Sequence, residues 1–320
     1  MFAVILFTNL LLISALGEFA LIEQIKKMVG TPAENEVWVG DDAAVIKLGD
    51  STLLATTDMT TAGVHMDLAF ATLEELGYKA VATAVSDIAA MGGSPFRSLI
   101  SVAAPKGTDF VSLHESAISA AREFGCFVVG GDISVATQVM VTVTVLGVST
   151  GSAPVLRSGA KVGDTVFATG CFGRAACGLR LLKLRAKQDD YPLLDVFTKA
   201  YLRPTPKLLE GKAAAMAGAT AMIDVSDGFS QDLGHIIDSS GVGIELSSLP
   251  VADGVSAEDA LFGGEDYELV FCASDLELVR SVFRKTGLSM PLEIGVCTNA
   301  AGQLLLDGKV LPRSGFQHDI

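Results

Sequence analysis

Hydrophobic and polar positions alternate along the chain with two different periods, and together these outline a mixed α and β fold. Between Glu18 and Val29 the apolar residues recur every three or four positions, as on one face of a helix. The segment Thr72 to Glu75 fits a capping box and predicts a long helix that ends near Gly92. Further helices are predicted at 109–124, 174–184, 205–217, 229–237 and 276–285.

Short apolar runs bounded by turn residues predict the strands. In the first half these lie at 43–48, 52–57, 99–103, 127–129 and 138–148, and in the second half at 165–169, 221–223, 243–246, 267–272, 292–296 and 303–306. The order ββαβαββ of the first half is an α+β pattern and not a doubly wound one. We expect a first domain at 17–150 and a second at 151–320, joined through a linker at 154–163.

Residues 1–16 stand apart from this pattern because Phe2 to Leu16 is almost entirely apolar. As a helix this segment would be ~23 Å long, which is short of the ~30 Å core of a bilayer. A secretory signal usually carries a basic region that is missing here. We interpret the segment as a hydrophobic extension outside the folded unit, with a signal or anchor as the alternative, and expect no stable membrane association.

The composition indicates a globular protein with a large core. The chain has 320 residues, half of them hydrophobic, and its 33 glycines indicate many tight turns. The net charge of −14 and the lack of a basic run exclude nucleic acid as an expected partner. The five cysteines form no C-x-x-C pair, which indicates reduced thiols in the cytoplasm and not a zinc site.

Acidic residues recur at the ends of apolar segments, each beside small residues. They are Asp41, Asp42, Asp58, Asp87, Asp132, Asp224, Asp227, Glu265 and Asp266. Two carboxylates ~4 Å apart repel by ~4 kcal/mol at an effective dielectric constant near 20. A cluster of them needs divalent cations, and oxygen ligands beside glycine-rich turns suit Mg²⁺ shared with a polyphosphate. The pattern therefore predicts phosphoryl transfer.

Taken singly, these acidic residues have ordinary structural explanations. Asp41 and Asp42 fit a turn, Asp132 after two glycines fits another, and Asp227 fits a helix N-cap. Asp87 is different, because it is predicted near the C-terminal end of a helix with no basic residue three or four places away. The recurrence of the whole set favours the metal site.

The usual phosphate-binding signatures are missing. The chain has no G-x-x-x-x-G-K-[ST] and no G-x-G-x-x-G that opens a helix after a strand. Arg157 lies in a glycine-rich turn, where it would clamp phosphate or be an ordinary surface residue. None of the four histidines has the spacing of a zinc ligand.

The order of these motifs resembles the thiamine-monophosphate kinase family, in the superfamily of aminoimidazole ribonucleotide synthetase and selenophosphate synthetase. The resemblance runs from Gly17 to His318. The motifs that carry it are Gly40–Ala44, Thr57-Asp58 with Gly63–His65, Ala84–Gly92, Gly130–Asp132, Arg157–Asp164, Leu202–Pro206, Ile223–Gly228 and Gly263–Leu269.

The resemblance implies a two-domain α+β fold, with a mixed or antiparallel sheet in the N-terminal domain and an α/β C-terminal domain. It implies ATP-dependent phosphorylation of thiamine monophosphate to thiamine diphosphate, by in-line transfer assisted by several Mg²⁺ ions. The first domain would pair with its counterpart in a homodimer, with ATP near the subunit boundary. The acceptor is already a phosphate, so no catalytic acid or base is expected, and positioning and charge neutralisation carry the reaction.

The same resemblance implies three sets of site residues. The Mg²⁺ ligands would be Asp42, Thr56, Thr57, Asp58, Asp87, Asp132, Asp224 and Asp227. The ATP contacts would be His114, Gly131, Asp132, Arg157 and Ser226, and the thiamine phosphate contacts His65, Glu265 and Phe316. The chain departs from the family at His114, where a tyrosine is frequent, and at its end, where an aromatic residue usually follows the histidine.

Two kinds of alternative remain open. Sister enzymes are one kind, although selenophosphate synthetases carry a reactive Cys or selenocysteine near the N-terminus, whereas the first cysteine here is Cys126. The hydrogenase-maturation relative ends in cysteine, whereas this chain ends in Ile320. Aminoimidazole ribonucleotide synthetase stays open as a sister enzyme, although the motifs fit the thiamine enzyme better. The other kind is a non-catalytic nucleotide-binding protein, in which we would expect some of the carboxylates to have been lost.

Overall fold

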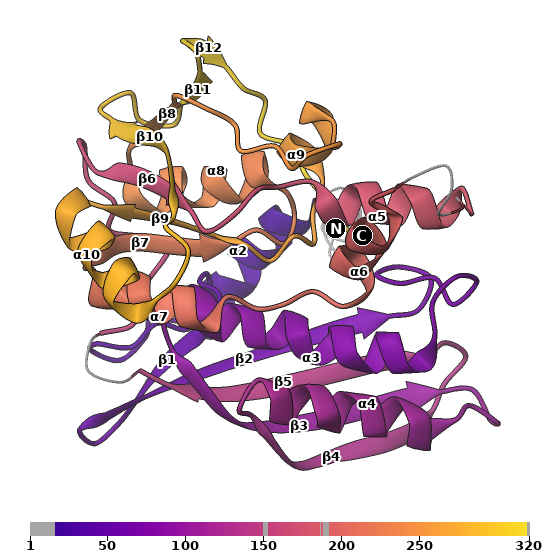
Figure 1. Ribbon diagram of the computed structural model, residues 1–320. Coiled ribbons are helices and arrows are strands. Elements are labelled where there is room, and N and C mark those ends of the chain that lie inside the picture. The colour runs from indigo at the N-terminus through magenta and orange to yellow at the C-terminus, as the bar shows by residue number, and fades with distance from the viewer. Residues whose placement is uncertain (1–16, 150–152, 186, 188–191, 319–320) are drawn as a thin grey trace, which may run out of the picture.

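The protein folds into two domains, each built on one β-sheet (Figure 1). The computed structural model describes residues 17–149, 153–185, 187 and 192–318. The hydrophobic extension predicted at 1–16 lies outside the described residues. In Figure 1 the first domain, in indigo and magenta, lies below the second, in orange and yellow. Within the described part of the chain, no helix is both long and apolar enough to cross a bilayer.

The first domain is a five-stranded mixed sheet covered on one face by two helices. Its strands are β1 (Ala44–Leu48), β2 (Ser51–Thr61), β3 (Ser94–Ala104), β4 (Phe127–Val135) and β5 (Met140–Val148), in the order β1-β2-β5-β3-β4. Only β3 and β4 are parallel within this sheet. Helices α3 (Leu73–Ala90) and α4 (Phe110–Glu123) cover one face (Figure 1), and every second residue of β5 is buried. The expected mixed sheet is confirmed.

The predicted capping box opens α3 as expected. The Thr72 hydroxyl accepts the N–H of Glu75, and the Glu75 carboxylate accepts the N–H of Thr72. The helix is buried over most of its length because the sheet lies on one side of it and the second domain on another.

Strands β2 and β4 extend further than predicted, and this changes the positions of Asp58 and Asp132. Asp58 was expected just past a strand, but β2 continues to Thr61 because it pairs with β5 over its whole second half. Asp132 was expected in a turn, but it lies inside β4. A Cβ on Gly131 would be 1.7 Å from the carbonyl oxygen of Ile100. Because Gly131 has no Cβ, β4 can pair closely with β3 at this position, and the strand continues where a turn was predicted.

The second domain is a seven-stranded sheet between two layers of helices. Its strands are β6 (Thr165–Ala168), β7 (Ala219–Asp224), β8 (Gly243–Leu246), β9 (Leu269–Ala273), β10 (Leu292–Thr298), β11 (Leu304–Leu306) and β12 (Lys309–Val310), in the order β12-β11-β8-β10-β6-β9-β7. Helix α8 (Phe229–Ser240) packs on one face, and α7 (Leu208–Met216) and α10 (Leu276–Thr286) pack on the other. The sheet is largely antiparallel, with β8 and β11 parallel.

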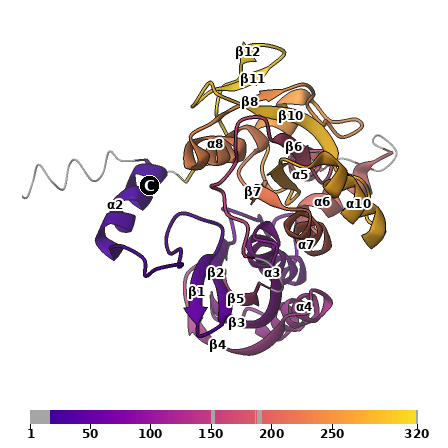
Figure 2. The same cartoon turned by 90° about the vertical axis from the view of Figure 1, so that its left-hand side faces the viewer.

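The remaining helices lie around these layers. Helix α5 (Arg174–Lys183) packs against α6 (Leu194–Leu202), and α9 (Ala257–Phe262) lies beside α8. Neither α6 nor α9 was predicted, because helices of nine and six residues owe their stability to packing and not to a long periodic pattern. Helix α2 (Glu18–Val29) stands away from both sheets in Figure 2 and has no buried residue.

Helix α3 joins the domains through a close contact with α7. A Cβ on Gly211 of α7 would be 2.1 Å from the carbonyl oxygen of Ala89, so only glycine allows the two backbones to approach this closely. The N-terminus of α7 also differs from the prediction: the helix begins at Leu208, three residues after the expected cap at Thr205.

We expect the substitution Gly211→Ala to destabilise the protein by about 1–3 kcal/mol, because overpacking would separate α3 from α7. Urea denaturation at constant pH measures the free energy of unfolding. Gly234→Ala in α8 is the matched control, since its Cβ would first meet the flexible side chain of Arg313, at 3.1 Å. An equal loss in both variants would contradict the close-contact explanation.

Candidate active site

A cleft of about 820 Å³ lies between the domains. It is lined by α2, β2 and α3 on one side and by the ends of β7 and α9, the loop that follows α9 and the C-terminal segment on the other. Most of the predicted site residues border it: Asp42, Thr56, Thr57, Asp58, His65, Asp87, Arg157, Asp224, Ser226, Asp227, Glu265 and Phe316.

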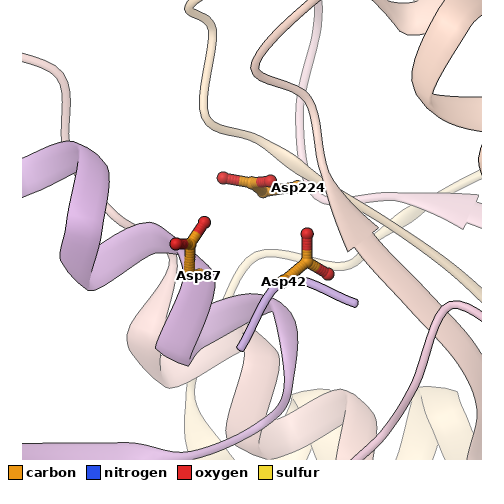
Figure 3. A group of neighbouring side chains, drawn as sticks. All are labelled: Asp42, Asp87 and Asp224. Atoms are coloured by element: carbon orange, nitrogen blue, oxygen red, sulfur yellow. The ribbon is translucent and has the colours of Figure 1, made fainter. Parts of the chain in front are cut away.

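Three carboxylates from separate parts of the chain meet in this cleft. Figure 3 shows them turned toward one space, with Asp87 on α3, Asp42 before β1 and Asp224 at the end of β7. One oxygen of each lies within 4.8 Å of the others. We call Asp42, Asp87 and Asp224 the carboxylate triad. Because Asp224 belongs to the second domain, the triad forms only when the domains are in contact.

Hydrogen bonds fix each carboxylate of the triad. Asp87 accepts the hydroxyl of Thr56, and Asp224 accepts the hydroxyl of Ser86 at 2.5 Å. Asp42 accepts two hydrogen bonds from the Arg157 side chain, from Nη2 at 2.5 Å and from Nε at 3.1 Å. The second oxygen of Asp42 is buried, with no hydrogen-bond partner among the described residues. A buried carboxylate oxygen without a protein donor is suited to bind a cation.

The negative charges of the triad repel one another. Burial and then the neighbouring carboxylates of Asp58, Asp224 and Asp42 raise the pKa of Asp87 well above its usual range. Burial and then Asp42 raise the pKa of Asp224 to about 7. Clustered carboxylate oxygens and an unsatisfied Asp42 oxygen fit a hard divalent cation such as Mg²⁺.

The loop from Ser226 to Gly228 is held by a carboxylate that the sequence analysis did not single out. Asp232 of α8 accepts the backbone N–H groups of Ser226, Asp227 and Gly228, at 3.1, 3.1 and 3.0 Å. The predicted N-cap at Asp227 is therefore wrong: Gly228 occupies that position. Asp227 faces the cleft instead, where burial and then Glu18 raise its pKa to about 6. The role of Asp232 could have been inferred from the sequence, because it is an acidic residue in the first turn of α8.

Aromatic rings line another part of the cleft. The rings of His65 and His318 lie 5.3 Å apart, and those of His318 and Phe316 lie 5.0 Å apart. Burial and then the nearby His318 and Lys79 lower the pKa of His65. Glu265 lies beside them with a left-handed backbone, φ 68°. We call His65, Phe316 and His318 the ring cluster.

The sequence analysis missed two further residues of the cleft, Lys79 and Tyr201. Lys79 pairs with Glu265 at 2.6 Å, and the Tyr201 hydroxyl donates to the carbonyl of His65 at 2.8 Å. The signal at Lys79 was a lysine three residues after Leu76 and four before Thr83, on the buried side of an otherwise apolar helix. Tyr201 lies on α6, which was not predicted, so its position was not accessible from the sequence.

Three predicted residues do not border the cleft of a single chain. Gly131 and Asp132 are exposed on β4, at the far edge of the sheet from β1. His114 lies on α4, where its Nδ1 is 2.7 Å from the carbonyl oxygen of Phe110. Thr57 borders the cleft, but its hydroxyl meets that of Thr144 at 3.0 Å, on the sheet face opposite to Thr56 and Asp58.

Comparison with known families covers both domains. The model of the AIR synthase related protein N-terminal domain matches residues 40–149, and that of the C-terminal domain matches residues 161–305. The thiamine-monophosphate kinase of Mycobacterium tuberculosis is 37% identical over 273 residues, which is 80% of each chain. That of Aquifex aeolicus is 35% identical over 318 residues, which is 95% of this chain and 98% of its own.

Solved structures agree with this likeness. A structure described as AaThiL complexed with AMPPCP and TMP has a TM-score of 0.83 at 33% identity, over 94% of this chain and 97% of its own. A structure described as the HypE-HypF complex has a TM-score of 0.71 at 21% identity, over 93% of this chain and 98% of its own, which shows a shared fold alone.

We expect the stability of the protein to fall below about pH 6.5 in part because of His235, which packs edge-on against Phe19 at 5.1 Å. Burial and then the charge of Arg157 lower the pKa of His235 to about 4. Between about pH 4 and pH 6.5, His235 therefore binds a proton more readily in the unfolded chain than in the native one. The free energy of unfolding consequently rises with pH over this range.

Between pH 7 and pH 5, the free energy of unfolding of the wild type should fall by about 1–2 kcal/mol more than that of His235→Gln. Urea denaturation at both pH values measures it. A difference that does not change with pH would show that His235 does not titrate in this range.

Proposed function

Because the chain belongs to the thiamine-monophosphate kinase family of AIR synthase related proteins, we propose that it transfers the γ-phosphoryl group of ATP to thiamine monophosphate. The product is thiamine diphosphate. The observation that carries this function is an interdomain cleft that holds the carboxylate triad and the ring cluster. The chain is also similar to a structure described as complexed with AMPPCP and TMP.

The triad, together with Thr56, Asp58 and Asp227, would hold Mg²⁺. Bound Mg²⁺ would supply the positive charge that offsets the repulsion between the phosphates of the two substrates. The Asp42 oxygen without a partner and the raised pKa values of Asp87 and Asp224 support this assignment.

The chain's own groups would orient the two substrates. Arg157 donates from a fixed guanidinium, because Asp42 binds its side chain and Asp41 accepts its backbone N–H at 3.1 Å. Ser226 lies on the loop that Asp232 holds. At the ring cluster, His65 and Phe316 would contact the thiamine rings, with Glu265 beside them. The nucleophile is a phosphate oxygen that is already ionised, so the site requires no base.

We also propose a homodimer formed through the first domain. Within the described part of the chain, strand β4 pairs with β3 alone, so its other edge has no strand partner there. Its apolar side chains are exposed, with Ile133 at 63% and Val135 at 65%. An exposed apolar edge of this kind favours pairing with another chain. In the dimer the outward-facing Thr57 and Asp132, with Gly131 and His114 of the same domain, would contact metal and ATP near the subunit boundary.

A cytoplasmic location is proposed from the cysteines. All five are free thiols, and four of them are buried. Proteins of oxidising compartments more often pair their cysteines, so unpaired thiols support a reducing compartment.

We expect Asp87→Asn to lower kcat by about 10²-fold or more while the fold survives, because one charged ligand of the phosphate-binding cations is lost. The assay follows thiamine diphosphate formed from thiamine monophosphate and ATP at saturating Mg²⁺. Asp50→Asn, in the exposed turn between β1 and β2, is the control and should keep wild-type turnover. Near-normal turnover of Asp87→Asn would contradict the metal assignment. A wild type that binds ATP but forms no product would favour a nucleotide-binding protein.

For the dimer, we expect the wild type to elute with the mass of two chains in light-scattering chromatography and the double variant Ile133→Lys with Val135→Lys to elute as one. Two charges on the free edge of β4 would oppose pairing. Val310→Lys, at an equally exposed apolar position on β12, should stay dimeric. A fully active wild type with the mass of one chain would overturn the proposed dimer.

A further inference from the structure

Lys79 is a fully buried cation at the wall of the cleft. Its side chain is 1% exposed, and it projects from the middle of α3. Lys79 and Arg157 are the lysine and arginine side chains among the described residues that border the cleft. Arg157 belongs with the triad, as described above, whereas Lys79 lies at the other end, beside Glu265 and the ring cluster.

Every face of the Lys79 ammonium group is occupied by the protein. Nζ lies 2.6 Å from the Glu265 carboxylate and 3.7 Å from the centre of the Tyr201 ring, and it donates weakly to the carbonyl of His65 at 3.5 Å. The Tyr201 hydroxyl donates to that same carbonyl at 2.8 Å. A cation held in this way by a carboxylate, a ring and a carbonyl has no donor left for a substrate.

Glu265 depends on this contact for its position. Its side chain is 24% exposed, so the carboxylate borders the cleft. Its backbone has φ 68°, a conformation that is costly for a residue with a side chain, and its N–H donates to the Ser226 carbonyl at 2.7 Å. The cleft is otherwise rich in carboxylates, whose repulsion would drive Glu265 toward solvent if Lys79 were neutral.

We propose that Lys79 is a positioning residue for the acceptor substrate. It fixes the Glu265 carboxylate and the His65 carbonyl, and through them the wall that receives a cationic heteroaromatic ring next to the ring cluster. This inference rests on the proposed function, because thiamine monophosphate is such an acceptor. Lys79 does not touch the substrate and takes no part in the nucleotide half of the cleft.

The test measures the affinities of the full-length protein for thiamine monophosphate and for ATP by calorimetry, in the wild type, Lys79→Met, Glu265→Gln and the double variant. We expect Lys79→Met to weaken thiamine monophosphate binding about tenfold or more and to change ATP binding by less than about twofold. We expect the double variant to bind thiamine monophosphate within about twofold of Glu265→Gln, because the two side chains act as one unit.

Lys207→Met is the matched control. Lys207 also forms a largely buried ion pair, with Glu268 at 3.0 Å, and neither residue borders the cleft. We expect it to leave the affinity for thiamine monophosphate unchanged even if the melting temperature falls. Equal losses for Lys79→Met and Lys207→Met, or equal losses of ATP and thiamine monophosphate affinity, would overturn the positioning role.

The two proposals fail in different ways. A wild type that neither binds thiamine monophosphate nor forms thiamine diphosphate overturns the function. A wild type that does both, with unchanged thiamine monophosphate affinity in Lys79→Met, overturns the role of Lys79 alone. If Lys79→Met does not fold, the double variant removes both charges of the pair, and a further tenfold loss of thiamine monophosphate affinity relative to Glu265→Gln would overturn the coupling.

Discussion

The repulsion between carboxylates brought together from two domains is the constraint on which the rest of the structure depends. Asp42 and Asp87 come from the first domain and Asp224 from the second, and the contact between α3 and the second domain brings them together. Each carboxylate accepts a hydrogen bond from a donor on another element. Holding three like charges close together nevertheless destabilises the folded state, which a fold without a site would not require. Such a cost is typical of a site shaped for a cation and a phosphate.

The two faces of the first sheet divide the predicted metal ligands. Along β2 successive side chains point to opposite faces, so Thr56 and Asp58 face α3 while Thr57 faces outward. Asp132 is paired in register with Ser101, and it lies on the outward face as well. Strand β2 therefore directs Thr56 and Asp58 toward the interdomain cleft and Thr57 toward the outer face of the sheet.

Much of the site could be predicted from the sequence because its residues lie next to glycines and at the ends of apolar segments. The acidic set and the capping box at Thr72 are local patterns, and local patterns can be read directly. The face on which Asp132 lies depends on strand register, and the position of Tyr201 depends on a helix stabilised by packing. The partners of Asp232 are only 4 to 6 residues away, so its role was open to prediction as an acidic residue in the first turn of α8. The role of Lys79 depends on Glu265, 186 residues further along the chain, and could not be assigned from a local pattern.

Under the proposed function, the two cations of the cleft would have different roles. Arg157 binds Asp42, so its charge offsets the carboxylate triad and stays available to phosphate. Lys79 is enclosed by Glu265 and Tyr201, so its charge is used within the protein and leaves a partly exposed carboxylate at the rings. The first arrangement favours an anion and the second favours a flat cation. Thiamine monophosphate carries both groups in one molecule, so in the proposed complex its phosphate would reach the triad while its rings lie beside Glu265 and the ring cluster.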